Sequence, residues 1–223
     1  MKSSLCLLAG VAVWASPAFA GTNGFTVPTF RGQPATTVAG WESFTVATDN
    51  LVGNAPELPG STATARILQF DPNAVILGSG NLYNQNHVSR FQLRYAATDG
   101  AGLVVLQMRT LGNELSYDSV RLTYDLGAGP VSLGAPREEL SRVSLGPPGQ
   151  GPGGSAVSSR WSWDISAAAP TSYTISFQAS DVSLSLDSAT LDTLAAKAVP
   201  EPGTWALLGA GAAALALGGW RRR

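Results

Sequence analysis

Runs of alternating apolar and polar residues constrain the fold of this 223-residue chain more than any other feature of its sequence. Successive side chains of a β-strand point to opposite faces of its sheet, so such a run buries one face and leaves the other in water. This pattern is typical of antiparallel sheets. In the three clearest runs, 119–126, 172–179 and 182–191, the positions predicted to face inward are Val120, Leu122, Tyr124 and Leu126; Tyr173, Ile175 and Phe177; and Val182, Leu184 and Leu186.

Glycine, proline, asparagine and aspartate separate these runs, and neither period nor composition favours a helix between the two ends of the chain. The runs predict an all-β domain, an antiparallel two-sheet sandwich with a jelly-roll topology. The segment 146–154 (GPPGQGPGG) is interpreted as a loop inside this domain, because strands on both sides are needed to complete a sandwich. The predicted strands are 37–47, 65–70, 88–95, 102–111, 119–125, 131–133, 139–145, 157–165, 172–179 and 182–191.

The amino terminus has the composition of a secretory signal peptide. It reads MKSSLCLLAGVAVWASPAFA, with one lysine, an apolar run over 5–15 and small residues at its end. Cleavage is expected between Ala20 and Gly21. Because Cys6 belongs to the part that would be removed, the mature domain, residues 21–198, has no cysteine and must be held together by burial.

The carboxyl terminus contains a short apolar stretch without charge, residues 204–220. As a helix it would be about 25 Å long, near the lower limit for crossing a bilayer core of about 30 Å. Trp205 and Trp220 stand at its ends, where indoles favour the headgroup region, and Arg221, Arg222 and Arg223 are expected on the cytoplasmic side. The alternative, a buried helix of a globular domain, agrees less well with these flanks. The sequence therefore predicts a C-terminal transmembrane helix with the domain outside.

Pro200 and Pro202 flank Glu201 just before this stretch and favour an extended backbone there. The order Pro-Glu-Pro, apolar helix and terminal arginine cluster, over residues 199–223, closely resembles the PEP-CTERM sorting signal of Gram-negative bacteria. The resemblance implies that exosortase, a membrane-embedded cysteine transpeptidase, recognises the tripeptide. It also implies export across the inner membrane, a transient membrane-anchored stage, and a final place in the envelope or extracellular matrix of an organism that makes exopolysaccharide.

The charge of the domain argues against nucleic acid as a partner. Residues 21–198 hold ten Lys or Arg against fourteen Asp or Glu, a net charge of −4. Nine of the ten cations are arginines, scattered singly along the sequence. Binding to phosphates needs clustered cations, so the sequence predicts no nucleic-acid partner.

The inventory of reactive side chains predicts a protein that is not an enzyme. His87 is the one histidine, which excludes zinc or iron sites built from several imidazoles or thiolates within one chain. No serine lies in a G-x-S-x-G turn, and His87 follows a polar run that predicts an exposed turn. No cofactor and no catalytic residue is therefore expected.

Paired carboxylates are the one catalytic arrangement that this inventory leaves open, since a glycosidase can use two acids from distant strands. Glu138 and Glu139 are adjacent, so in a strand they would point to opposite faces and could not act on one substrate. Other acids beside aromatic residues are the alternatives, as in sugar clefts: Glu42 next to Trp41, Glu114, and Asp118 next to Tyr117.

Trp161 and Trp163 stand two residues apart and share one face of a predicted strand. They have two interpretations: platforms on which sugar rings stack, or core side chains, which the continuation of the apolar face by Ile165 favours. The run SLSLDSATLDTL is weakly similar to the closing strand of galactose-binding-like jelly rolls, which adds to the sugar-binding hypothesis.

Calcium is the one metal that the composition allows, because it accepts carboxylate and carbonyl oxygens. Acids near predicted strand ends are candidates for a structural ion, although turn formation explains each of them equally well. These positions are Asp49 with Asn50, Asp71 with Asn73, Asp118 and Asp187.

Together these features predict an exported, non-enzymatic β-sandwich protein that associates with extracellular polysaccharide or biofilm matrix. Two alternatives remain. One is a secreted carbohydrate-active enzyme with paired carboxylates. The other is a structural matrix protein that binds copies of itself.

Overall fold

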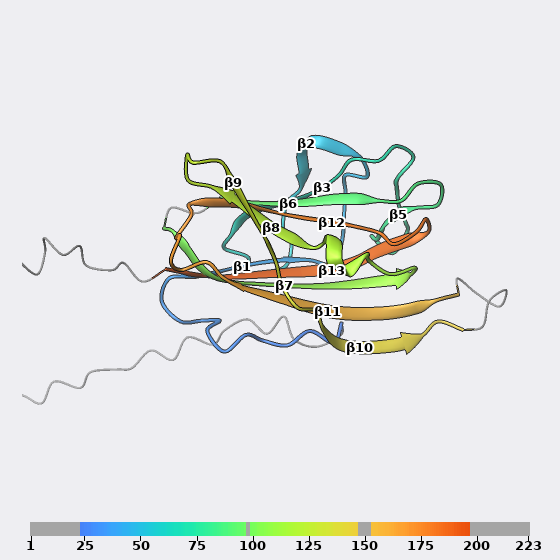
Figure 1. Ribbon diagram of the computed structural model, residues 1–223. Coiled ribbons are helices and arrows are strands. Elements are labelled where there is room, and N and C mark those ends of the chain that lie inside the picture. The colour runs from blue at the N-terminus through green and yellow to red at the C-terminus, as the bar shows by residue number, and fades with distance from the viewer. Residues whose placement is uncertain (1–22, 97–98, 147–152, 197–223) are drawn as a thin grey trace, which may run out of the picture.

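The computed structural model describes residues 23–96, 99–146 and 153–196. These residues form two antiparallel β-sheets packed face to face, sheet B above sheet A in Figure 1. A single 3-10 turn, η1 (Tyr117–Ser119), is the one helical element among them. The prediction of an all-β fold with two antiparallel sheets is thus confirmed.

Sheet A has seven strands in the order β10-β11-β7-β13-β5-β4, with β1 also paired to β13. The last described strand, β13, therefore lies between β7 and β5. Its strands are β1 (Thr36–Trp41), β4 (Val75–Ile76), β5 (Leu82–Asn84), β7 (Ala101–Gly112), β10 (Glu138–Ser144), β11 (Ser155–Asp164) and β13 (Leu184–Ala195).

Sheet B has six strands in the order β2-β3-β6-β12-β8-β9. The chain passes between the two sheets eight times: β1 to β2, β3 to β4, β5 to β6, β6 to β7, β7 to β8, β9 to β10, β11 to β12 and β12 to β13. The jelly-roll topology stays a prediction. The strands of sheet B are β2 (Asp49–Asn54), β3 (Thr64–Gln69), β6 (Arg90–Ala96), β8 (Arg121–Asp125), β9 (Pro130–Gly134) and β12 (Ser172–Gln178).

The core lies between the sheets and follows the alternation of β12 and β6. Tyr173, Ile175 and Phe177 are all buried, as predicted. Across the strand pair, the Tyr173 ring stacks on Tyr95 with 4.7 Å between centroids, and Phe177 stacks on Phe91 at 5.0 Å. These aromatic pairs add to the free energy that area burial alone provides.

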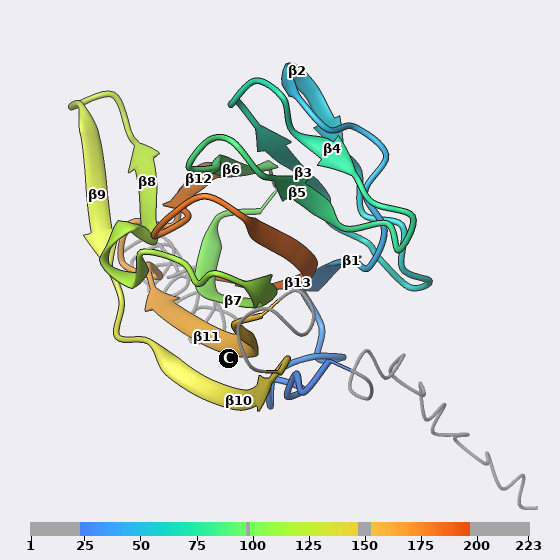
Figure 2. The same ribbon diagram turned by 90° about the vertical axis from the view of Figure 1, so that its right-hand side faces the viewer.

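Two predicted core positions lie outside the core. In the run of β8, Val120 and Leu122 are buried, but Tyr124 is half-buried and the side chain of Leu126 is 60% exposed. The reason is that the chain beyond Tyr124 leaves the sandwich and turns in the β8–β9 hairpin, which projects at one side in Figure 2. Val182 is also half-buried, because it precedes the start of β13.

A register shift interrupts the alternation of β13. Leu184 and Leu186 are buried, as predicted, and a bulge between Leu186 and Ser188 then moves the inward positions to Ala189 and Leu191. A bulge inserts one extra residue, so the core face continues with changed parity.

Strands β2, β4 and β5 were not predicted. The predicted strand 37–47 ends at Trp41, and the backbone N–H groups of Thr45 and Val46 instead donate to the side-chain oxygen of Asn54, both at 2.8 Å. The side chain of Leu51 in β2 is 79% exposed, so this strand carries no core pattern. The strands β4 and β5 have two and three residues, too few to show a period of two.

The segment 23–35 lies across the outer face of sheet A, on the side away from sheet B (Figure 1). The backbone N–H of Thr26 donates to the Gln107 side chain at 2.8 Å, and the Ser158 hydroxyl donates to the carbonyl of Asn23 at 2.5 Å. Both faces of sheet A are therefore covered along β7, β11 and β13. The outer face of sheet B is exposed at Arg66 and Arg94 but covered at Leu68, whose side chain lies next to Gly53.

Candidate functional site

The two neighbouring tryptophans are core residues. The side chains of Trp161 and Trp163 are 1% and 4% exposed, and the Trp163 indole N–H donates to the carbonyl of Leu133 at 3.3 Å. Neither indole has a free face for a sugar ring, which corrects the carbohydrate-contact hypothesis for this pair in favour of the core interpretation. Trp41 is likewise fully buried and donates to the carbonyl of Asn54.

The adjacent acids of β10 have separate partners. Glu138 forms an ion pair with Arg160 of β11 at 2.5 Å, whereas Glu139 contacts Arg137 at 2.7 Å and Arg142 at 2.9 Å. This separation agrees with the expectation that the two carboxylates do not act together.

Glu114, in the loop after β7, belongs to a network that we call the Arg142 cluster: Glu114, Tyr117, Arg137, Glu139 and Arg142. Arg142 donates to both glutamates, and the Tyr117 hydroxyl donates to Glu114. The guanidinium of Arg137 lies 3.7 Å from the centre of the Tyr117 ring, a cation–π contact. The cluster joins β10 to the segment around η1.

The pKa values in the Arg142 cluster favour charged carboxylates. The hydrogen bonds from Arg142 lower the pKa of Glu114, and those from Arg142 and Arg137 lower the pKa of Glu139 to about 2. Burial and the bond to Glu114 raise the pKa of Tyr117 to about 12. A general acid for glycoside hydrolysis needs a raised carboxyl pKa. The two shifts have the opposite direction and suit a structural ion-pair network.

The other candidate acids have hydrogen-bond or ion-pair partners or are exposed to solvent. Asp71 accepts hydrogen bonds from the backbone N–H and the guanidinium of Arg90. Asp187 contacts Arg109 at 3.2 Å and accepts a bond from Asn81 at 3.0 Å. Glu42 accepts from the Asn23 amide at 3.1 Å, and Asp118 is exposed.

His87 is exposed, as its sequence context predicts, and its ring contacts the Asn73 amide at 3.2 Å. Within 23–96, 99–146 and 153–196 there is no group of three or more His, Cys, Asp or Glu residues placed to hold a metal ion. The side chains of Asp49 and Asn50 are outside the described part. A structural calcium ion therefore stays a prediction.

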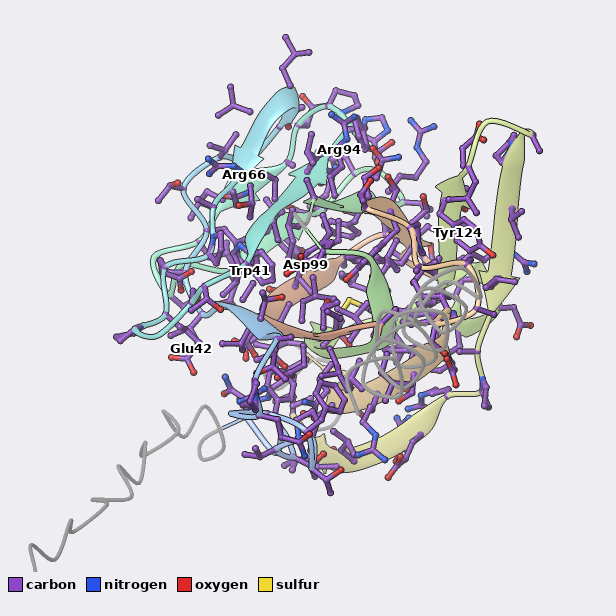
Figure 3. The ribbon with its side chains drawn as sticks, turned by 90° about the vertical axis from the view of Figure 1, so that its left-hand side faces the viewer. Trp41, Glu42, Arg66, Arg94, Asp99 and Tyr124 are labelled. Atoms are coloured by element: carbon purple, nitrogen blue, oxygen red, sulfur yellow. The ribbon has the colours of Figure 1, made fainter. Side chains whose placement is uncertain are left out.

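A hollow of about 450 Å³ lies at the end of the sandwich where β13 ends. Threonine hydroxyls line it, and Asp99, labelled in Figure 3, stands at its exposed side. Two of these hydroxyls are engaged with tyrosines: Thr37 with Tyr95 at 2.9 Å, and Thr193 with Tyr173 at 2.7 Å. These two hydroxyls are therefore partly occupied within the protein.

The outer face of sheet B is the more open polar surface. Residues that pair across the strands form rows on this face, and one row comprises Arg66, Arg94, Thr174, Thr123 and Ser132. A hollow of about 370 Å³ is lined by Arg94, Thr123 and Thr174 of this row, and one of about 260 Å³ lies further along β6 and β12, beside Gln92 and Ser176. Hydroxyl and amide groups can donate and accept hydrogen bonds, as binding to sugar hydroxyls requires.

The alternation in the sequence indicates only that the polar positions of each strand face solvent, so this surface was not predicted. The signal was present in RFQLRYA of β6, where the outward positions carry Arg90, Gln92 and Arg94. What the sequence lacks is the strand order that places β3, β6, β12 and β8 side by side.

The family model of the PEP-CTERM protein-sorting motif matches residues 198–223. The chain is a PEP-CTERM protein. Its motif is a signal for exosortase, so this PEP-CTERM protein is exported and sorted at the membrane. The match includes Pro200, Glu201 and Pro202, the residues that sequence analysis identified. A search among curated proteins finds no match to the chain.

The ends of this PEP-CTERM protein are outside the described residues. These include the expected cleavage site at Ala20 and Gly21, the Pro-Glu-Pro tripeptide, and Trp205, Trp220 and the arginines 221–223. The part that the structure describes contains no helix long and apolar enough to span a membrane. The transmembrane helix over 204–220 stays a prediction. The described chain ends at Ala196, just after β13 and two residues before the matched motif.

Proposed function

We propose that this PEP-CTERM protein is a non-enzymatic β-sandwich protein of the envelope or extracellular matrix that associates with extracellular polysaccharide. The observation that carries the proposal is the sorting motif over residues 198–223, since it directs the domain out of the cytoplasm. In this proposal a helix over 204–220 anchors the chain until exosortase acts, with Arg221, Arg222 and Arg223 on the cytoplasmic side.

Two features of the domain support the absence of catalysis and the association with glycans. Of the carboxylates next to aromatic residues, Glu42 and Glu114 are held in hydrogen bonds or ion pairs, whereas Asp118 is exposed. The outer face of sheet B presents exposed guanidinium groups at Arg66 and Arg94, with half-buried hydroxyl and amide groups beside them. A flat polar surface of this kind suits a polymer better than a small molecule, which needs a deep pocket.

The test compares the natural protein with a variant that lacks residues 199–223. We expect the natural protein in the fraction that holds envelope and extracellular polysaccharide, released when the polysaccharide is enzymatically digested, and the shortened variant outside that fraction. A natural protein that stays in place after complete digestion of the polysaccharide overturns the association.

The same preparation separates the two alternatives. Turnover of a polysaccharide library that one Glu or Asp substitution abolishes identifies a carbohydrate-active enzyme. Sedimentation that depends on protein concentration in the absence of glycan identifies a self-associating matrix protein.

A further inference from the structure

The arginines of this domain fall into two groups. All nine arginines between residues 21 and 198 are in the described part, and six of them form ion pairs with carboxylates. The three without a carboxylate partner among the described residues are Arg66, Arg94 and Arg121. All three are exposed and lie on the outer face of sheet B.

The strand register brings these three side chains together. Arg66 of β3 is directly opposite Arg94 of β6, and Figure 3 shows both on the same side of the molecule. Arg121 of β8 lies two strands from Arg94, in the neighbouring row with Ser176. With strands about 4.8 Å apart, the three arginines extend over about 15 Å across the sheet. This set is called the arginine face.

The hydrogen bonds of Arg94 and Arg121 do not neutralise their positive charges. The Nε of Arg94 donates to Gln92 at 2.8 Å, and the Nε of Arg121 donates to Ser132 at 3.2 Å. Both acceptors are neutral, and both bonds use the inner nitrogen of the guanidinium. The outer nitrogens, which form the fork that binds carboxylates in pairs, have no described partner on Arg94 and Arg121.

Among the described side chains, no acid forms an ion pair with the arginine face, and the nearby acids Asp125 and Asp71 have other partners. Asp125, at the end of β8, accepts the backbone N–H groups of Gly127 and Gly129 at 2.7 and 3.2 Å. The side chain of Asp71 is 8% exposed and pairs with Arg90. Like charges directly opposite each other in a sheet are destabilising, so Arg66 and Arg94 cost stability in the free protein. An anion bound between them would remove that cost.

We propose that the arginine face binds acidic polysaccharide, a polymer that carries carboxylate groups, with its chain running across β3, β6, β12 and β8. This inference rests on the proposed function and names the ligand class and the surface. The guanidinium groups bind the carboxylates of the polymer, and the serine and threonine hydroxyls between them bind its hydroxyl groups. Charge complementarity decides the class, because three cations without a carboxylate partner among the described side chains gather on one face of a domain with net charge −4.

The test measures binding of the full-length chain, purified in mild detergent, to polygalacturonate and to neutral dextran of similar length. We expect polygalacturonate to bind and the triple variant R66Q/R94Q/R121Q to bind at least tenfold more weakly. Binding of the natural chain should also weaken as salt rises, because charged groups at a surface are screened. The thermal unfolding midpoint of the triple variant should not fall, since the substitutions remove repulsion.

Matched variants make the result specific. R160Q removes one positive charge from β11 of sheet A and should leave binding within about twofold of the natural chain, whereas R94Q should weaken it clearly. The triple lysine variant R66K/R94K/R121K keeps the charge but loses the fork, and should bind between the natural chain and the glutamine variant. If the triple glutamine variant fails to fold, the weaker binding of the triple lysine variant still tests the inference.

Several results overturn the inference. These are equal binding by the natural chain and the triple glutamine variant, equal loss in R160Q and R94Q, tighter binding of dextran than of polygalacturonate, or no binding of polygalacturonate. Equal competition by single-stranded DNA would also overturn it, because the face would then be a general anion surface. None of these results contradicts the proposed function if digestion of the native polysaccharide still releases the natural protein from the envelope fraction. If digestion does not release it, the proposed function and the inference about the arginine face are both wrong.

Discussion

Arg31 and Asp192 form a bidentate ion pair between the segment that covers sheet A and the closing strand β13. Their atoms are 2.5 Å apart for Nε and Oδ1 and 2.6 Å apart for Nη2 and Oδ2, and the side chains are 4% and 1% exposed. The pair joins positions 161 residues apart. It holds the first described residues of the domain against the strand that leads to the sorting motif.

Replacing Arg31 with methionine should lower the free energy of unfolding by about 3–5 kcal/mol, because it leaves Asp192 as an uncompensated buried acid. Burial already raises the pKa of Asp192, and Arg31 acts against that shift. Urea denaturation of the full-length chain in detergent measures the loss. Arg160→Met breaks a more exposed pair with Glu138 and should cost less than about 1 kcal/mol. Equal losses in the two variants would contradict the role assigned to Arg31.

The core position of Trp161 predicts a large effect of truncation. Trp161→Ala should destabilise the domain by about 3–5 kcal/mol, since it leaves a cavity between the sheets. Trp161→Phe keeps most of the apolar volume and should cost clearly less. Thermal unfolding followed by circular dichroism compares the two variants with the natural chain. A Trp161→Ala variant as stable as the natural chain would return this residue to the surface and reopen its role in sugar binding.

The all-β fold could be predicted because local alternation reports burial directly. Each of the ten predicted runs overlaps an observed strand, and the inward set of β12 is correct at Tyr173, Ile175 and Phe177. The C-terminal sorting signal could be predicted for a different reason. It is a linear pattern that can be recognised without the folded domain, and the matched motif at 198–223 confirms it. The N-terminal signal peptide stays a prediction.

The remaining features depend on contacts between distant residues. The bulge in β13 is set by its pairing with β7, which no period within β13 records. Trp161 is buried because sheet B lies over it. The spacing of Trp161 and Trp163 within β11 is the same whether the two indoles face solvent or the core, so the sequence alone does not separate these interpretations. The arginine face requires the register that sets Arg66 opposite Arg94, 28 positions further along the chain. In the sequence, these arginines cannot be distinguished from the six that form ion pairs with carboxylates.

The Arg142 cluster predicts an acid-sensitive contribution to stability. The pKa of Glu139 in the folded chain, about 2, is below that of a free glutamate, about 4.3. The ionised form is therefore favoured by folding, and its contribution is present above about pH 4.3 and is lost as the pH falls towards 2. The lowered pKa of Glu114 acts in the same direction. Urea denaturation between pH 6 and 2.5 should show a smaller fall in stability for Glu139→Gln than for the natural chain.

Glu138→Gln is the control for this pH series, because it removes a neighbouring carboxylate that stands outside the cluster. Its stability should fall with acid in nearly the same way as that of the natural chain. A pH profile that Glu139→Gln leaves unchanged would show that the Arg142 cluster contributes nothing measurable to folding.

The predicted membrane helix can be tested by charge. Leu208→Lys together with Leu215→Lys should release unprocessed protein from membranes, because each charge near the centre of a spanning helix costs about 2.5–3.5 kcal/mol on the insertion scale. Membrane fractionation in a strain without exosortase activity measures the release. Thr204→Lys, at the start of the apolar stretch, is the matched control and should stay in the membrane fraction. A double lysine variant that also stays there would contradict a spanning helix.

Recognition of the Pro-Glu-Pro tripeptide by exosortase predicts a processing defect without a folding defect. Glu201→Gln should leave the domain folded and exported yet block maturation, because the transpeptidase would lose its contact with the charged side chain of the tripeptide. The intact mass of the protein recovered from the envelope or medium measures maturation. Glu57→Gln makes the same charge change within the domain, where the carboxylate accepts backbone N–H groups from Glu42 and Ser43, and should mature normally. A Glu201→Gln chain with the mature mass would show that exosortase does not require the carboxylate of the tripeptide.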